Sequence, residues 1–195
     1  MKEKLRQLPA LWNTWFLYFL AFAFVGWLYE VCVFYFELGY GFVNRGFCFG
    51  PYLPIYGIGG MLLLLTVGPL KHRRVSVGPV SITPLLCFLA ICLLTTALEL
   101  FSSYLTEVIY HIRLWDYSDY GPNFDGRIAL RSTLRFGVMG MVGLYLIHPA
   151  MKRLTGFFRR RFPRGYRLVS YLIIAVFLAD LIYHMVCGSN YAEVL

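Results

Sequence analysis

Five long apolar runs dominate the chain, and short polar connections separate them. The runs cover residues 13–36, 52–70, 82–110, 129–150 and 167–187. Most of them reach the ~20 residues that an α-helix needs to cross ~30 Å of hydrocarbon. The pattern therefore predicts an all-α integral membrane protein with about five transmembrane helices, formed as a single helical domain over residues 1–195.

Glycine and proline positions add detail to the second and fourth runs. The start of the second run contains Pro51, Pro54, Gly57, Gly59 and Gly60. This cluster predicts irregular backbone at the start of that run. In the fourth run, Gly137, Gly140 and Gly143 recur at every third position and predict a close helix contact. The pair His148 and Pro149 is predicted to stop the fourth helix, because proline cannot donate a backbone hydrogen bond.

Composition agrees with the membrane class. The chain is 59% hydrophobic and only 14% charged, whereas soluble domains carry about 25% charged residues. The net charge is +8, but the basic residues lie between apolar runs and not among exposed aromatics, so no nucleic-acid partner is expected. The first apolar run extends to residue 36, which is too long for the ~7–15 apolar residues of a signal peptide and predicts an uncleaved first span.

The distribution of basic residues predicts the orientation. Thirteen Lys and Arg residues lie in the N-terminal segment and in the second and fourth connections, and three lie in the first and third connections. The positive-inside rule then places the N-terminus in the cytoplasm. We expect a multi-pass protein of the cell membrane, specifically a bacterial inner membrane.

Ionisable side chains interrupt the apolar runs in several distant segments. They are Glu30, Glu99, Arg131, Arg135 and Asp180. A charge in hydrocarbon is costly, so such residues usually face the interior of the helix bundle and mark function. At a rise of ~1.5 Å per residue, all five are expected in the outer half of the membrane. The pattern predicts an outward-facing polar cavity with Glu30, Glu99 and Arg131 at its centre.

Two aromatic-rich connections, residues 39–57 and 114–127, are expected on the same outer side. Further candidate cavity and binding residues in or near them are Asn44, Arg45, Tyr52, Tyr56, Trp115, Asp116 and Arg127. These connections would either cover the cavity as a lid or form an interfacial aromatic belt with turns. For the charged residues, the alternative to a cavity is a buried ion-pair network that fixes the helix register. Both alternatives stay open.

The sequence also suggests an internal repeat and no metal site. The first four spans resemble two hairpins that point the same way, followed by one further helix, and each hairpin carries a late glutamate, Glu30 or Glu99. The five cysteines have no spacing typical of zinc ligands and are expected to be free thiols. No metal and no cofactor is expected.

Several motifs occur in order over about residues 15–150: GWLYEVCVFYF, FVNRGFCFGPYLPIYGIGG, LELFSSYLTE, LWDYS, GRIAL, FGVMG and IHP. In these motifs the chain resembles the Putative ABC-transporter type IV family, which is also linked to eukaryotic transmembrane protein 229. The resemblance implies that the motif positions include Glu30, Asn44, Arg45, Tyr56, Glu99, Trp115, Asp116 and Arg127. Arg135 departs from the family pattern, in which an apolar residue is commoner.

Three functions remain open. The first is a permease or transporter-like protein for an anionic or lipid-like solute. The second is a membrane enzyme acting on a lipid or lipid-linked substrate at the outer leaflet, although no nucleophile motif supports catalysis. The third is a non-catalytic membrane subunit or assembly factor. The chain has no Walker motif, so any ATP hydrolysis would belong to a partner ATPase. Membrane lipid and a second copy of the chain are the other expected partners.

Overall fold

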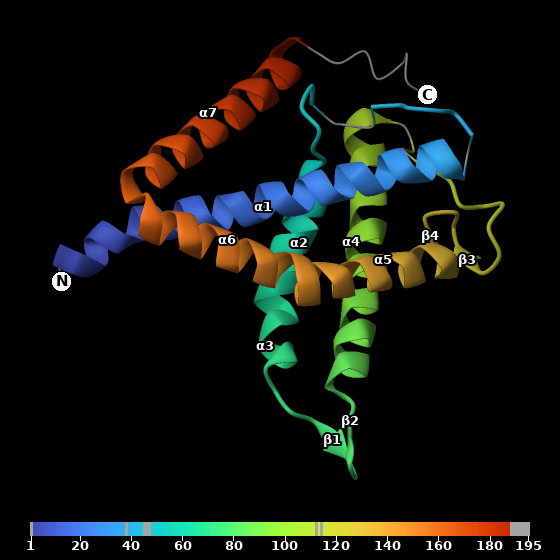
Figure 1. The fold of residues 1–195 in the computed structure, drawn as a ribbon. Helices are drawn as coiled ribbons and strands as arrows, with labels where there is room; N and C mark the ends of the chain where they lie inside the picture. Colours follow the sequence, from blue (N-terminus) through green and yellow to red (C-terminus); the bar gives the residue numbers. More distant parts are fainter. Residues whose placement is uncertain (1, 38, 45–47, 112, 114, 188–195) are drawn as a thin grey trace. The chain divides into compact units, whose positions relative to one another are not determined.

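The protein is an all-α membrane protein, as the apolar runs predict (Figure 1). The computed structural model describes residues 2–37, 39–44, 48–111, 113 and 115–187. In chain order the elements are α1 (Lys2–Phe36), α2 (Pro54–Thr66), α3 (Gly68–Lys71), β1 (Ser76–Val77), β2 (Val80–Ser81), α4 (Thr83–Tyr110), β3 (Asn123–Phe124), β4 (Ile128–Ala129), α5 (Leu130–Val142), the π-helical turn η1 (Gly143–Ile147), α6 (His148–Arg161) and α7 (Pro163–Cys187).

Four helical stretches are long and apolar enough to cross a membrane. They are Trp12–Phe36, Thr83–Ile109, Leu130–Arg161 and Pro163–Val186. The second predicted run is a shorter apolar helix, α2, with 13 residues. At ~1.5 Å per residue, α2 covers only about 20 Å, so it does not reach through the hydrocarbon by itself. The irregular backbone expected at the start of this run is limited to residues 52–53, because the chain is α-helical from Pro54 to Thr66 and includes Gly57, Gly59 and Gly60 in regular helix.

The described residues fall into two compact units, Met1–Gly60 with Ala150–Leu195, and Met61–Pro149. The single domain expected from the sequence stays a prediction. In the first unit, α7 packs against α1. Asn13 Nδ2 donates a hydrogen bond to Ser170 Oγ at 3.1 Å, and the ring of Phe177 lies 5.4 Å from the ring of Phe16. Buried polar contacts and edge-on aromatic contacts together hold this helix pair.

In the second unit, α5 packs closely against α4. A Cβ atom added at Gly137 would lie 2.6 Å from Cys92 Sγ and 2.7 Å from the ring of Phe88. One added at Gly140 would collide with the side chain of Ile91. Only glycine permits this approach of two helices, so the predicted close contact is confirmed.

The predicted helix stop at His148 and Pro149 is wrong. Helical conformation runs without a break from Leu130 to Arg161, and the π-helical turn η1 lies directly before the proline. The N–H of His148 donates to the carbonyl of Gly143, five residues back. A π turn widens the helix locally, which gives room for a proline ring that would otherwise clash with the preceding turn.

A lysine from a distant segment donates a hydrogen bond to the carbonyl group that the proline leaves without a backbone donor. Pro149 has no N–H, and in the five-residue pattern the carbonyl left without a backbone donor is that of Leu144. The Nζ of Lys71 donates to this oxygen at 2.9 Å and lies 4.6 Å from the ring centroid of Tyr145. The helix therefore continues past Pro149 because a side chain replaces the missing backbone donor.

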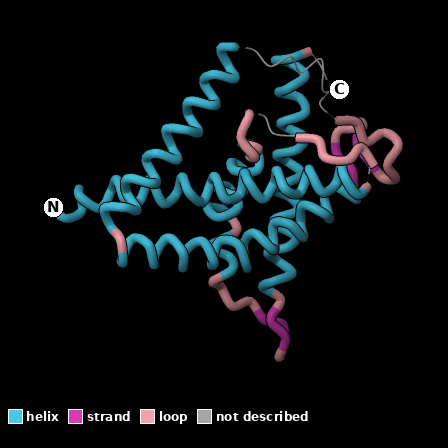
Figure 2. Tube along the Cα trace, turned by 45° about the horizontal axis from the view of Figure 1, so that its top comes forward, coloured by secondary structure: helices cyan, strands magenta, loops and turns pink. Residues whose placement is uncertain are grey.

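Two short antiparallel hairpins complete the second unit, shown in magenta in Figure 2. In β1–β2, Ser76 pairs with Ser81, and in β3–β4, Asn123 pairs with Ala129. The turn of the β3–β4 hairpin contains Asp125 and Gly126, which both have positive φ, of 52° and 61°. An Asp-Gly pair is typical of the tight turns that need two such residues. This turn places Arg127 at the start of the site described next.

Candidate functional site

A row of polar side chains follows α4 and faces the start of α5. On α4 the row contains Thr96, Glu99, Ser103 and Glu107, and the facing residues are Arg127, Ser132 and Thr133. Spacings of three and four residues place the α4 members on one face of the helix. We call these seven residues the polar seam.

The deeper part of the polar seam is hydrogen-bonded across the two helices. Thr96 Oγ1 lies 2.9 Å from Thr133 Oγ1, and Ser132 Oγ donates to Glu99 Oε1 at 3.3 Å. Ser132 Oγ also lies 3.1 Å from the hydroxyl of Tyr117. Glu99 is only 8% exposed, so a carboxyl group is buried within a long apolar helix. Such a group needs hydrogen-bond partners, and the facing Ser132 hydroxyl supplies one to Oε1.

The other end of the polar seam is an ion-pair network around Arg127, which is 4% exposed. Its guanidinium donates to Asp125 at 2.7 Å, to Ser103 at 3.0 Å and to the carboxylate of Glu107. It also lies over the ring of Tyr104, with Cζ 3.9 Å from the centroid. Bonding from the guanidinium holds the pKa of the Asp125 carboxyl below its ordinary value.

The connection before Arg127 is built to hold that network. Trp115 Nε1 donates to the carbonyl of Arg127 at 2.9 Å, and Tyr117 N donates to the carbonyl of Gly126 at 2.7 Å. Asp116 Oδ1 accepts from the Ser118 hydroxyl at 2.6 Å, and this bond lowers the pKa of Asp116. Trp115 and Asp116, predicted as binding residues, therefore contact their own connection.

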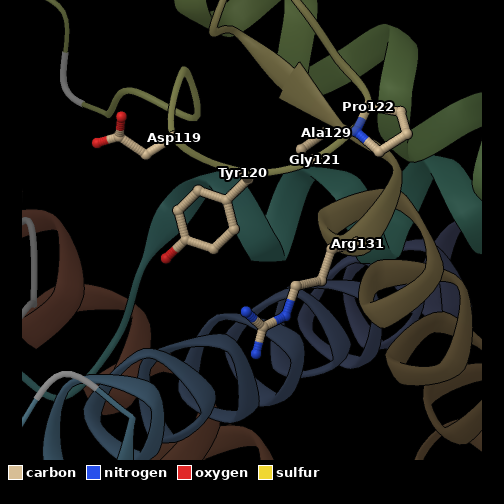
Figure 3. Close-up of a pocket in the computed structure, with 6 residues that line it drawn as sticks. All are labelled: Asp119, Tyr120, Gly121, Pro122, Ala129 and Arg131. Carbon is tan, nitrogen blue, oxygen red and sulfur yellow. The ribbon is translucent and has the colours of Figure 1, made fainter.

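A pocket of about 520 Å³ lies beside the polar seam (Figure 3). It is lined by Asp119, Tyr120, Gly121, Pro122, Ala129 and Arg131. The exposed Arg131 lies one residue before Ser132 of the seam, and its Cζ is 5.7 Å from the ring centroid of Tyr120. In Figure 3 the carboxylate of Asp119 points away from the guanidinium. The pocket thus presents a cation and an aromatic ring, a combination suited to anionic groups.

The first unit contains two smaller polar contacts. Asp180 of α7 accepts hydrogen bonds from the backbone N–H of Phe49 at 3.2 Å, from that of Gly50 at 2.9 Å and from the hydroxyl of Tyr52. These bonds tie the irregular segment before α2 to α7. A carboxylate that accepts two backbone donors is well satisfied without a cation.

The second contact lies between α1 and α2 within the same unit. The hydroxyl of Tyr56 donates to Glu30 Oε1, and the ring of Tyr56 packs on Gly26, where any Cβ would collide with it. Trp27 Nε1 donates to Asn44 Oδ1 at 2.7 Å. Glu30 is half-buried in this contact.

The predicted site residues are thus divided between the units. Glu30 and Asp180 belong to the first unit, and Glu99, Arg131 and Arg135 belong to the second. Their convergence on one cavity stays a prediction. Arg135 is half-buried on α5, one helical turn after Arg131, and the predicted binding residue at position 45 lies outside the described residues.

Sequence reasoning missed the partners of the charged residues it selected. Ser103, Glu107 and Asp125 contact Arg127, and Ser132 contacts Glu99. A signal was present, because Glu99, Ser103 and Glu107 recur at four-residue spacing, which aligns them on one helix face. The Asp125-Gly126 pair similarly indicates a tight turn before Arg127.

Comparison with known proteins identifies one family. The family model described as Putative ABC-transporter type IV matches residues 17–185, which covers both units. No curated protein and no solved structure matches the chain.

Proposed function

Because the chain belongs to the Putative ABC-transporter type IV family, we propose that it is a permease-type subunit that provides the membrane path for a small anionic solute. The observation that carries this proposal is the polar seam, a line of hydrogen-bonding side chains between two long apolar helices. The seam adjoins a pocket that presents Arg131. Polar groups at membrane depth are expensive and commonly mark solute paths.

In this proposal the side chains have distinct roles. The guanidinium of Arg131 attracts and binds the anionic group of the solute at the pocket, where Tyr120 packs against the same space. Glu99 and the hydroxyls of Ser132 and Thr133 provide hydrogen-bond partners deeper in the helix pair. The network around Arg127 stabilises the end of the polar seam next to the β3–β4 hairpin, because the guanidinium of Arg127 is bonded to three side chains.

The energy source belongs to a partner in this proposal. The chain has no Walker motif, so a separate ATPase would hydrolyse ATP. Affinity purification of the tagged chain from native membranes tests this part. Vanadate-sensitive ATP hydrolysis in the purified material, carried by a second polypeptide, is the expected result, and a preparation without any nucleotide-hydrolysing subunit would contradict it.

Solute flux through the purified protein tests the path itself. Proteoliposomes preloaded with unlabelled phosphate, sulfate, succinate or glutamate are given the labelled form of the same anion, and exchange is compared with protein-free vesicles. We expect exchange of at least one anion, and a loss of about tenfold or more in Arg131→Gln, since a charge-assisted hydrogen bond to the solute is removed. A similar loss is expected in Glu99→Gln.

The matched control is Arg159→Gln, an exposed arginine of α6 outside the pocket. Its exchange rate should stay within about twofold of the wild type, as for surface substitutions in general. Wild-type vesicles that exchange none of the four anions, or variants at positions 99 and 131 that exchange at the wild-type rate, would refute the proposed path.

A further inference from the structure

The stretch that runs from α6 into the start of α7 carries a concentration of positive charge that no described acidic residue pairs with. Its basic residues are Lys152, Arg153, Arg159, Arg160, Arg161, Arg164 and Arg167. All seven are exposed, and among the described residues none of them forms an ion pair. The sequence explains this, because no aspartate or glutamate occurs between Asp125 and Asp180. We call these seven residues the basic segment.

The apolar side chains of α6 lie on the side of the helix away from most of its charges. Helical spacing groups Leu154, Phe157 and Phe158 on one face, and all three are exposed. At ~100° per residue, Lys152 and Arg159 fall on the opposite face, and Arg153 and Arg160 flank it. Arg161 falls among the apolar residues, with its Cζ 5.3 Å from the ring centroid of Phe162. A basic face opposite an aromatic face is typical of helices that lie in the interface of a membrane.

A third side of α6 contacts α1 within the first unit, and this contact sets the orientation of the apolar and basic sides of α6 within that unit. Thr155 is buried, and its Oγ1 lies 3.5 Å from the hydroxyl of Tyr18 in α1. Thr155 falls between the apolar and basic faces of α6. The helix therefore contacts α1 through this side and leaves both other faces uncovered by described residues.

The length of the helical stretch shows where α6 lies along the membrane normal. Helical conformation from Leu130 to Arg161 covers 32 residues. About 20 residues suffice for the hydrocarbon core, so about twelve exceed it. These are the residues of α6 beyond Pro149, the orange helix of Figure 1. Counted from Leu130, the end that carries the basic segment is therefore expected at the depth of the lipid headgroups.

We infer that the basic segment is a binding surface for anionic phospholipid headgroups. Arg159 and Arg160 contact the phosphates, and Phe157 and Phe158 insert between the upper parts of the acyl chains. Each basic residue near an anionic membrane surface strengthens such binding, and arginine can bind a phosphate through two hydrogen bonds. This inference does not depend on the proposed solute path, because it concerns other residues and a different ligand.

The test is a lipid titration of the purified full chain in a neutral detergent. Dioleoylphosphatidylglycerol or dioleoylphosphatidylcholine is added, and the midpoint of thermal unfolding gives an apparent Kd for each lipid. The wild type should bind phosphatidylglycerol at least about tenfold more tightly, and the double variant Arg159→Gln with Arg160→Gln should lose about tenfold or more of that preference.

The chain offers a matched control in another adjacent pair, Arg73 and Arg74, which are also exposed. The double variant Arg73→Gln with Arg74→Gln removes the same charge and should keep the preference. In the wild type alone, raising NaCl from about 50 mM to about 500 mM should reduce the preference, because salt screens exposed charges. This second measurement does not depend on whether any variant folds.

Three results would overturn the inference. They are equal affinity of the wild type for both lipids, a preference that survives in the variant at positions 159 and 160, and an equal loss in the variant at positions 73 and 74. The last result would mean that total charge, and not this surface, decides the lipid preference.

Discussion

The chain contains two arginine-rich regions that use their charge in opposite ways. Around the β3–β4 hairpin, Arg113 and Arg127 form ion pairs with Glu107 and Asp125, so two cations meet two carboxylates where the hairpin packs on the end of α4. In the basic segment, seven cations meet no carboxylate among the described residues. The charges of the first region stabilise the fold through ion pairs within the chain, whereas those of the basic segment are available to bind a ligand.

The largest effect on stability is expected from Arg127→Gln. This substitution removes a guanidinium that is 4% exposed and bonded to Ser103, Glu107 and Asp125. Its loss removes the hydrogen bonds that satisfy a buried site and leaves the two half-exposed carboxylates without their shared cation. We expect the unfolding midpoint in detergent to fall by about 5 °C or more.

The control for that prediction comes from the other region. Arg159→Gln also removes one arginine, but an exposed one without an ion pair, and its unfolding midpoint should change by about 1 °C or less. Equal shifts in the two variants would remove the distinction between the regions.

A smaller effect, of opposite sign at the α4–α5 contact and in α6, is expected from replacing glycine by alanine. At Gly137 the new methyl group would lie 2.6 Å from Cys92 Sγ, and such overpacking costs about 1–3 kcal/mol. At Gly156, on α6, no atom of the described residues lies within 4 Å of the added carbon, apart from its chain neighbours and the backbone of its own helix. Alanine there should stabilise the helix by up to about 1 kcal/mol.

Thermal unfolding of the two alanine variants provides the measurement. A lower midpoint for Gly137→Ala together with an unchanged or higher midpoint for Gly156→Ala is the expected pair of results. If both variants lost stability equally, the open surroundings of α6 would be disproved.

The smallest effect on stability is expected from lowering the pH. The pKa of Asp125 is lowered by its bond to Arg127, so the folded state binds this proton less readily than the unfolded chain. The contribution of this carboxylate to stability is therefore fully present above the ordinary pKa of 3.8 and is lost as pH falls below that value. The basic segment has no carboxylate that would titrate in this way.

Unfolding midpoints measured from pH 7 down to about pH 3 check this sign. Asp125→Asn should be less stable than the wild type at pH 7, and the difference should shrink as the wild-type carboxylate becomes protonated. A difference that is constant over the whole range would show that the charge of Asp125 is not responsible.

The sequence predicts best what depends on neighbouring residues. Four of the five apolar runs correspond to long helices, and the glycine repeat at 137 and 140 lies at a close helix contact. Both features follow from local composition and helical periodicity. Three of the seven residues of the polar seam were equally accessible, because Glu99, Ser103 and Glu107 share a four-residue spacing.

Contacts between distant segments were beyond such reasoning. Asp180 is bonded to Gly50, 130 residues away, and Glu99 to Ser132, 33 residues away. No spacing in the chain specifies these pairs, because each depends on how separate helices pack. The helix stop at Pro149 was predicted wrongly for the same reason, since the donor that compensates for the proline is Lys71, 73 positions from its acceptor.

Because of Lys71, the helical stretch of residues 130–161 cannot be transferred into another protein by itself. Residues 130–161 transplanted into a protein without an amine at the position of Lys71 would lose the side-chain donor to the carbonyl of Leu144. Such a graft should break at Pro149, whereas a graft that brings residues 68–71 with it should remain helical. Residues 68–71 and 130–161 therefore form one structural unit, although they are separated in the sequence, and both have to be transferred together.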